Sequence, residues 1–119
     1  MARTFAIIFG VALIILGILG FLPNFITAGK LFGIFASNLE INMAHLVTGI
    51  LGLLCGFSSN PASRVYFIVV GILYTFLAIL GLANTDKLLL CMFADNLANN
   101  WLHAGISIFS LYVGLTCKN

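Results

Sequence analysis

Residues 42–45 read Asn-Met-Ala-His, and residues 100–103 repeat the step as Asn-Trp-Leu-His. Each step stands at the start of a long apolar run, and His45 and His103 are the only histidines of the chain. Because Asn and His are three residues apart in both steps, they lie on one face of a helix. A matched pair of polar steps in apolar runs predicts a repeated helical architecture.

The composition indicates that the solvent of this chain is largely lipid. Of its 119 residues, 62% are hydrophobic and only 7% are charged, whereas a soluble domain carries roughly a quarter charged residues. The net charge is a weak +2, and no basic stripe alternates with aromatic residues, so we expect no nucleic-acid partner. The three cysteines form no Cys-x-x-Cys pair, and we interpret those in apolar runs as packing residues.

Four apolar runs predict four transmembrane helices in a single domain, residues 1–119. Each run has about the length that crosses the hydrocarbon core of a bilayer. The segment Ser58–Arg64, rich in turn-forming residues, is predicted to be a loop that divides the chain into two halves. The runs are Phe5–Leu22, Ile41–Phe57, Val65–Leu82 and Trp101–Thr116.

The two long loops each contain an apolar patch, Lys30–Phe35 and Leu88–Phe93. Such patches predict short interfacial helices that fold over one end of the bundle. Asn38 precedes the second run and is of a residue type that caps helices.

Positive charges predict the orientation in the membrane. With four spans, Arg3, Arg64 and Lys118 share one side, and Lys30 and Lys87 lie on the other beside three acidic residues. The positive-inside rule therefore predicts that both termini are cytoplasmic.

The two halves of the chain match each other. Residues 35–39 read Phe-Ala-Ser-Asn-Leu and residues 93–97 read Phe-Ala-Asp-Asn-Leu, and the same offset relates the two Asn-x-x-His steps. We therefore predict an all-α integral membrane four-helix bundle made of two tandem helical-hairpin repeats, residues 5–57 and 65–116. An even number of spans per repeat gives both copies the same orientation.

A seam of small residues follows each histidine. Its positions step by three and four residues, which places them on one helix face, and small residues let membrane helices approach closely. We therefore expect the seam to pack against protein and the histidines to point the same way. The seam residues are Gly49, Gly52 and Gly56 in the first half and Ser107, Ser110 and Gly114 in the second.

The chain resembles a bacterial family of small four-span membrane proteins known only as a domain of unknown function. The family pattern has Asn-x-x-His-Leu-x-x-Gly in the second span, here Asn42–Gly49. It has Asp-Asn-x-Leu-His before the fourth span, here Asn99–His103 with Asn99 in place of Asp. The resemblance covers nearly the whole chain. It implies a multi-pass protein of the bacterial inner membrane and brings no activity with it.

Two interpretations of the histidines are open. In the first, the histidines and a polar cluster of asparagines join helices and loops, and the protein is a structural or accessory subunit, self-associated or attached to a larger membrane complex. In the second, His45 and His103 oppose each other and hold a b-type haem or share a metal ion, although a zinc or copper site would be incomplete from one chain. The asparagines of the polar cluster are Asn38, Asn42, Asn96 and Asn100.

Transport is a third interpretation, and catalysis is not supported. Small exporters have a similar length, but here no Asp or Glu lies inside an apolar run, where intramembrane carboxylates mark ion pathways. Ser107 and Ser110 have no nearby Asp that would support nucleophilic chemistry. We therefore expect no enzyme activity.

Overall fold

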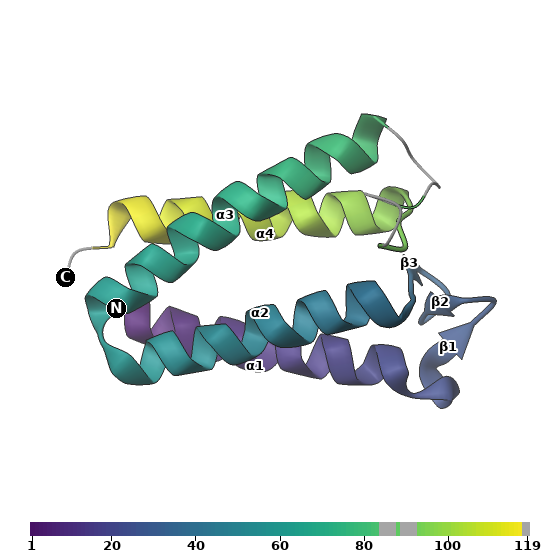
Figure 1. Cartoon of the computed structure of the whole chain (residues 1–119), viewed down its shortest axis with the longest axis horizontal. Helices are drawn as coiled ribbons and strands as arrows, with labels where there is room; N and C mark the ends of the chain where they lie inside the picture. The colour runs from purple at the N-terminus through teal and green to yellow at the C-terminus, as the bar shows by residue number, and fades with distance from the viewer. Residues whose placement is uncertain (84–87, 89–92, 118–119) are drawn as a thin grey trace.

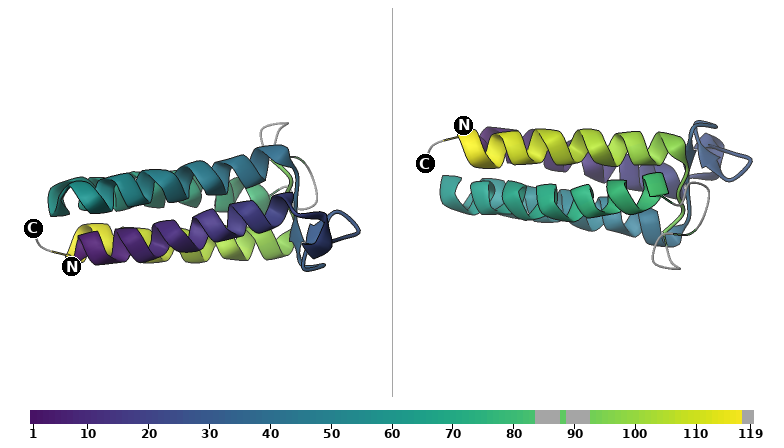
Figure 2. Two further views of the ribbon diagram at one scale, coloured as in Figure 1. Left: turned by 90° about the horizontal axis from the view of Figure 1, so that it is seen from below. Right: turned by 90° about the horizontal axis from the view of Figure 1, so that it is seen from above.

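Four long helices form two antiparallel hairpins that lie side by side (Figures 1 and 2). The computed structural model describes residues 1–83, 88 and 93–117. Helix α1 packs along α2 and α3 along α4, and the hairpins meet mainly through α2 and α3. The all-α fold predicted from the sequence is confirmed. Within the described residues, the helices are α1 (Ala2–Phe21), α2 (Leu39–Ser58), α3 (Asn60–Ala83) and α4 (Leu97–Thr116).

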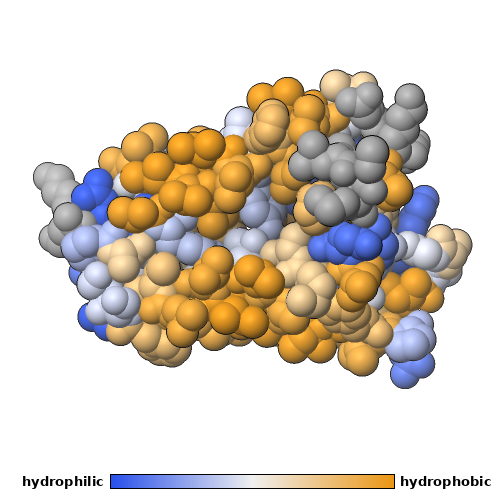
Figure 3. Space-filling view, in the orientation of Figure 1, coloured by the Kyte–Doolittle hydropathy of each residue, from blue (hydrophilic) through white to orange (hydrophobic). Residues whose placement is uncertain are grey.

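Of these helices, α1, α2 and α3 are long and apolar enough to cross a membrane. An α-helix of 20 residues extends about 30 Å, the thickness of a hydrocarbon core. Large apolar side chains cover the outer faces of the helices, and strongly hydrophilic residues gather toward the two ends of the molecule (Figure 3). Helix α4 has the same length but is more polar, because it buries Asn99, Asn100 and His103 near its start.

The join between the hairpins is shorter than the sequence predicted. We expected Ser58–Arg64 to be a loop, but only Ser59 lies between α2 and α3. The Ser59 hydroxyl oxygen accepts a hydrogen bond from the Ala62 amide at 3.1 Å and so caps α3. Pro61 lies in the first turn, where a missing N–H is tolerated. These turn-forming residues therefore start a helix.

The first loop forms a small sheet instead of the predicted interfacial helix. After a 3-10 turn at Pro23–Phe25, strands β1 (Ile26–Thr27), β2 (Lys30–Leu31) and β3 (Phe35–Ala36) pair antiparallel in the order β1-β2-β3. Leu31 on the middle strand is buried. The second apolar patch, Leu88–Phe93, lies largely outside the described residues.

Two pairs of consecutive residues with left-handed backbone conformation explain why this loop forms a sheet. Ala28 and Gly29 connect β1 to β2 with φ of 53° and 76°, and Phe32 and Gly33 follow β2 with φ of 55° and 70°. Consecutive residues with positive φ form the tight hairpin turns that match strand twist, and a right-handed helix cannot contain them. The two X-Gly pairs are the signal that distinguishes this loop from a helix.

The core lies where α1, α3 and α4 meet. Phe67 of α3 is fully buried, with its ring centroid 5.5 Å from that of Phe9 and 5.9 Å from that of Phe109. Tyr66 packs against Phe67 edge to face at 5.2 Å. These rings fill the volume between the hairpins near the middle of the helices.

Backbone contact at small residues holds each hairpin together. A Cβ added to Gly49 on α2 would lie 2.6 Å from the carbonyl oxygen of Gly10 on α1. In the second hairpin, a Cβ on Gly114 would lie 3.0 Å from the backbone nitrogen of Ile68. The distance at Gly49 is too short for a methyl group, so glycine is required there, and a methyl group at position 114 would need Ile68 to shift.

Two equivalent arginines form hydrogen bonds across the open end of each hairpin, opposite its connecting loop. Arg3 Nε donates to the Gly56 carbonyl at 2.9 Å, and Arg64 Nε donates to the Gly114 carbonyl at 3.3 Å. A guanidinium group is favourable near a helix C-terminus, where the last carbonyls have no partner within the helix. The chain termini lie at this end, and the sheet lies at the opposite end (Figure 1).

Gly49→Ala should separate the helices of the first hairpin, because the new methyl group meets backbone atoms of α1. Overpacking of this kind costs about 1 to 3 kcal/mol, measurable as a lower free energy of unfolding in detergent. Gly105→Ala is the control, since a Cβ at Gly105 has no atom within 4 Å, and it should cause no loss. Equal effects of the two substitutions would contradict the close approach.

Candidate functional site

His45 and His103 meet between α2 and α4. Their Nε2 atoms are 3.3 Å apart and their ring centroids 5.5 Å apart, and both side chains are buried, with exposures of 5% and 0%. A nitrogen–nitrogen hydrogen bond needs one N–H and one lone pair, so only one of the facing nitrogens carries the shared proton. The structure thus brings one histidine from each hairpin into direct contact.

The hydrogen-bond surroundings favour one tautomer for each ring. His103 Nδ1 is buried and has no hydrogen-bond partner among the described residues. An unpaired N–H in the interior is rarer than an unpaired acceptor, so we assign a lone pair to this nitrogen and the proton to His103 Nε2. His103 Nε2 then donates to His45 Nε2, and His45 carries its own proton on Nδ1.

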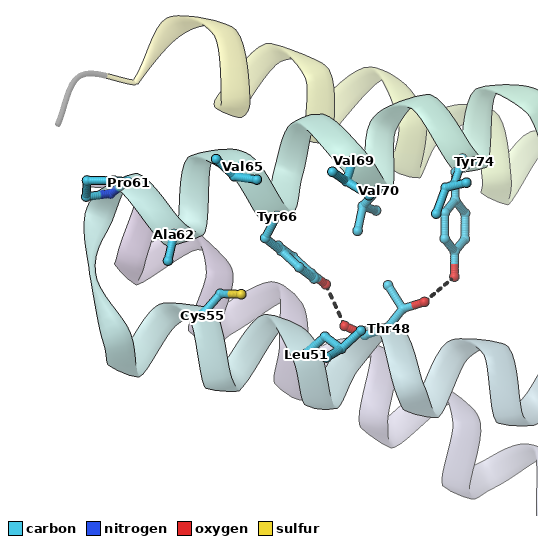
Figure 4. A pocket seen from close by; sticks show the side chains of 11 residues that line it. Thr48, Leu51, Cys55, Pro61, Ala62, Val65, Tyr66, Val69, Val70 and Tyr74 are labelled. Carbon is cyan, nitrogen blue, oxygen red and sulfur yellow. Dashed lines mark hydrogen bonds between the residues drawn. The ribbon is translucent and has the colours of Figure 1, made fainter.

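Two tyrosines of α3, Tyr66 and Tyr74, bond Thr48 of α2 beside the histidine pair, and Figure 4 shows both bonds. The Tyr74 ring packs edge to face against His103 at 5.4 Å, and its hydroxyl lies 2.9 Å from Thr48 Oγ1. Thr48 Oγ1 donates to the Ala44 carbonyl, so the Tyr74 hydroxyl is the donor of that bond. The Tyr66 hydroxyl donates to the Thr48 carbonyl at 2.6 Å. The hydroxyl groups of both tyrosines therefore form hydrogen bonds with the same residue, Thr48.

Thr48 and its tyrosine partners were not predicted as site residues from the sequence. Thr48 follows His45 by three residues and so lies on the same helix face, which was the available signal. Tyr66 and Tyr74 are eight residues apart on α3, and that spacing places them on a similar face. Tyr112, by contrast, is 68% exposed.

A pocket of about 560 Å³ lies between α2 and α3, beside these hydroxyl groups (Figure 4). Its polar side chains are Thr48, Tyr66 and Tyr74, whose hydroxyls already bond within the protein. The remaining walls are apolar, from Leu51 on α2 to Leu73 on α3. The pocket therefore presents apolar surface and almost no free polar group.

Asn42 and Asn100 occupy matching places at the sheet end of the bundle. Asn42 Nδ2 donates to the Gly20 carbonyl at 2.9 Å, which ties α2 to the end of α1. Asn100 lies against Gly81 of α3, where an added Cβ would overlap its amide. Asn100 is fully buried, and its amide has no hydrogen-bond partner in the described part of the chain.

Asn38 and Asn96 cap the second helix of each hairpin. The Asn38 side chain accepts a hydrogen bond from the Ile41 amide, and the Asn96 side chain accepts one from the Asn99 amide, both at 2.9 Å. Asn96 Nδ2 also donates to the Ile34 carbonyl at 2.8 Å. This bond joins the loop of the first hairpin to the start of α4.

Five of the six seam residues approach the partner helix of their own hairpin, and the sixth, Ser110, is buried. A Cβ on Gly52 would lie 3.2 Å from the Ala6 carbonyl of α1, and one on Gly56 would lie 3.1 Å from the Arg3 carbonyl. Ser107 bonds the hydroxyl of Thr75 on α3, and Ser110 is fully buried. Gly49 and Gly114 make the backbone contacts described above.

The histidine pair alone does not form a metal or haem site. No group of three or more His, Cys, Asp or Glu side chains comes together within the described residues, and two nitrogens are half of a tetrahedral zinc site. A porphyrin must lie between its two axial imidazoles. The Nε2 atoms of His45 and His103 are only 3.3 Å apart. In this arrangement there is no space between the two rings for a porphyrin.

The chain belongs to a protein family described as Domain of unknown function (DUF4383), whose model matches residues 3–116. No curated protein matches the chain, and no solved structure matches it. The function of this family is unknown, and the match indicates no activity for the chain.

His45→Ala and His103→Ala should be coupled in a double-mutant cycle, because the rings bond each other. We expect a coupling free energy of about 0.6 kcal/mol, the mean for hydrogen bonds between membrane helices. The cycle is measured by unfolding in mixed detergents. Combining His45→Ala with the exposed Tyr112→Ala is the control and should be additive. Additive losses for the histidine pair would contradict the contact.

Proposed function

We propose that this member of the DUF4383 family is a non-catalytic membrane protein with a structural or accessory role. It would form a four-span bundle of two repeated hairpins. It would reside in a bacterial inner membrane, with both termini cytoplasmic. It would act as a self-associated protein or as a part of a larger membrane complex. The bilayer itself is then its first partner.

The contact between His45 and His103 carries this proposal. Two buried histidines bond each other across the hairpins, and Tyr66 and Tyr74 both bond Thr48. Polar groups that are committed to helix–helix contacts stabilise a fold and are not available to bind a substrate. Intramembrane polar residues of this kind act as interhelical links.

Matched contacts in the two hairpins support a duplication. Arg3 and Arg64 bond the last turns of α2 and α4 in the same way, and Asn38 and Asn96 cap the starts of the same helices. Gly20 lies under Asn42 as Gly81 lies under Asn100. The spacing between Arg3 and Arg64 is 61 residues and that between Asn38 and Asn96 is 58, so the difference falls in the loops.

The proposed fourth span rests on the position of α4. Its 20 residues equal the length of α1 and α2, and it runs beside α3 over its length (Figures 1 and 2). Its polar residues Asn99, Asn100 and His103 are buried. A helix whose polar face is covered by protein presents its apolar face to lipid, which permits a span.

Cofactor binding and transport have less support. The direct histidine contact leaves no place for haem, and the metal alternative lacks further ligands within the described residues. Among the described helical residues the one acidic side chain is Glu40, which is exposed in the first turn of α2. Carboxylate-driven export therefore has no intramembrane group to use.

Fusions at the C-terminus distinguish four spans from three. With an even number of spans, a C-terminal green fluorescent protein should be fluorescent in bacteria and a C-terminal alkaline phosphatase inactive. Alkaline phosphatase inserted between Ala28 and Gly29, in the turn between β1 and β2, is the control and should be active. An active C-terminal phosphatase would show that α4 does not cross.

Gently extracted protein should be colourless and metal-free and should migrate in native mass spectrometry above its monomer mass of 12.8 kDa. We expect this because His45 and His103 bond each other and the exterior is apolar. The same sample gives the visible spectrum and the mass. A Soret band that disappears in His45→Ala would establish the haem alternative, and a monomer without partners would contradict the subunit role.

A further inference from the structure

The pocket between α2 and α3 is an elongated groove. On α3 its lining residues recur every fourth residue in two adjacent rows, from Pro61 near the start of the helix to Tyr74 near its middle. On α2 they extend from Cys55 to Thr48. The thirteen residues from Pro61 to Tyr74 correspond to about 20 Å of helix. The groove therefore runs from the end of the bundle that carries the chain termini to its middle (Figures 1 and 4).

The groove is open to the exterior along its side. Four of its lining residues are between 47% and 60% exposed, namely Leu51, Val65, Val69 and Leu73. The tyrosine hydroxyls inside it already form hydrogen bonds with Thr48. An occupant therefore enters from the surroundings of the protein and meets apolar groups. In a bilayer those surroundings are lipid, and an empty groove would lose the dispersion contacts that a filled one makes.

The interface between α1 and α4 shows how side-chain size creates the groove. The offsets of 61 and 58 residues that relate the two arginines and the two capping asparagines also relate Phe9 to Val70 and Phe109 to Leu51. The Phe9 and Phe109 rings pack at 5.5 Å between α1 and α4. Between α2 and α3, the smaller side chains of Val70 and Leu51 line the groove instead. The groove thus lies where the other interface has phenyl rings.

The dimensions of the groove match a single hydrocarbon chain. A volume of about 560 Å³ over about 20 Å gives a mean cross-section of about 30 Å². An α-helix with its side chains is about 10 Å in diameter, which gives roughly 80 Å², so a helix of a second copy or of a partner is too wide. Half of the hydrocarbon core of a bilayer is about 15 Å thick. The groove therefore covers the depth of one leaflet.

The end of the groove at Pro61 lies in a basic part of the molecule. Arg3 and Arg64 bond the last turns of α2 and α4 at this end, and Arg3 is exposed. The acidic residues within the described part of the chain, Glu40 and Asp95, lie at the opposite end, next to the starts of α2 and α4. Basic side chains at a membrane surface attract anionic lipid headgroups. The charge at this end therefore suits a phosphate group.

We propose that this groove binds one acyl chain of a phospholipid, with the phosphate at the end of the bundle that carries Arg3 and Arg64. The chain follows the two rows of α3 side chains inward, and its methyl end reaches Thr48 and Tyr74. The inference rests on the membrane location proposed above and does not depend on the structural or accessory role.

The test is photolabelling of the full chain in vesicles of phosphatidylglycerol and phosphatidylethanolamine. The probe is a phosphatidylglycerol with a diazirine at the end of one acyl chain, and mass spectrometry identifies the labelled residues. We expect labelling of Tyr74, which is only 4% exposed, to saturate as the amount of probe increases. Labelling of Leu54, which is 61% exposed and outside the groove, should instead rise in proportion to the probe.

Leu51→Phe introduces the residue of the matching position, Phe109. It should reduce the saturable labelling about 10-fold, because the ring and the acyl chain together would overpack the groove. Leu54→Phe, on the same helix but outside the groove, is the matched control and should be labelled like the wild type. Val69→Phe, which also fills the groove, decides the matter if Leu51→Phe does not fold.

Labelling of Tyr74 that does not saturate, or that is unchanged in both Leu51→Phe and Val69→Phe, would overturn the proposal. Cross-links between two copies of the chain through groove residues would also overturn it and assign the groove to a second copy. Equal labelling by a diacylglycerol probe, which lacks the phosphate, would overturn the assignment to a phospholipid. The fusion and native-mass measurements described above test the span count and self-association independently, so a failure here is distinguishable from a failure of the proposed function.

Discussion

A Cβ on Gly49 would stand 2.6 Å from the carbonyl oxygen of Gly10, so the helices of the first hairpin meet backbone to backbone. In a bilayer such a contact matters because apolar side chains gain little from leaving lipid, and dispersion between closely packed helices then replaces the hydrophobic effect. The remaining polar contacts depend on it. Asn42 reaches the Gly20 carbonyl only because no side chain on α1 separates the two helices at that height.

The contacts between the hairpins have a different character. The α2–α3 interface contains two hydrogen bonds to Thr48, and the histidine contact joins α2 to α4. Each such bond contributes about 0.6 kcal/mol on average, which is small. Their larger effect is geometric, because apolar helix surfaces can slide past one another whereas a bonded Tyr–Thr pair fixes one rotation and one height.

Much of this arrangement could be predicted from residue spacing, and the parts that could not have local causes. The helices follow from apolar runs, and the Asn38 cap follows from its residue type. The contact of His45 with His103 required the packing of two hairpins, which spacing only suggests. The sheet was not predicted because an apolar patch such as Lys30–Phe35 is also typical of an interfacial helix, whereas Ala28–Gly29 and Phe32–Gly33 adopt positive φ in the structure and form turns. The Asn100 amide has no hydrogen-bond partner among the described residues, and the sequence gives no signal of this, since Asn42 is the same residue with its bonds complete.

Only Ser59 separates α2 from α3, and this short join has a mechanical consequence. Two rigid rods linked by one residue cannot move apart at the linked end, and rotation of one about its axis is passed on to the other. The arginine contacts to the last turns of α2 and α4 lie at that same end. Any opening between the hairpins therefore turns about Ser59 as a hinge. The displacement is greatest at the far end of the bundle, where the sheet and Asn100 lie.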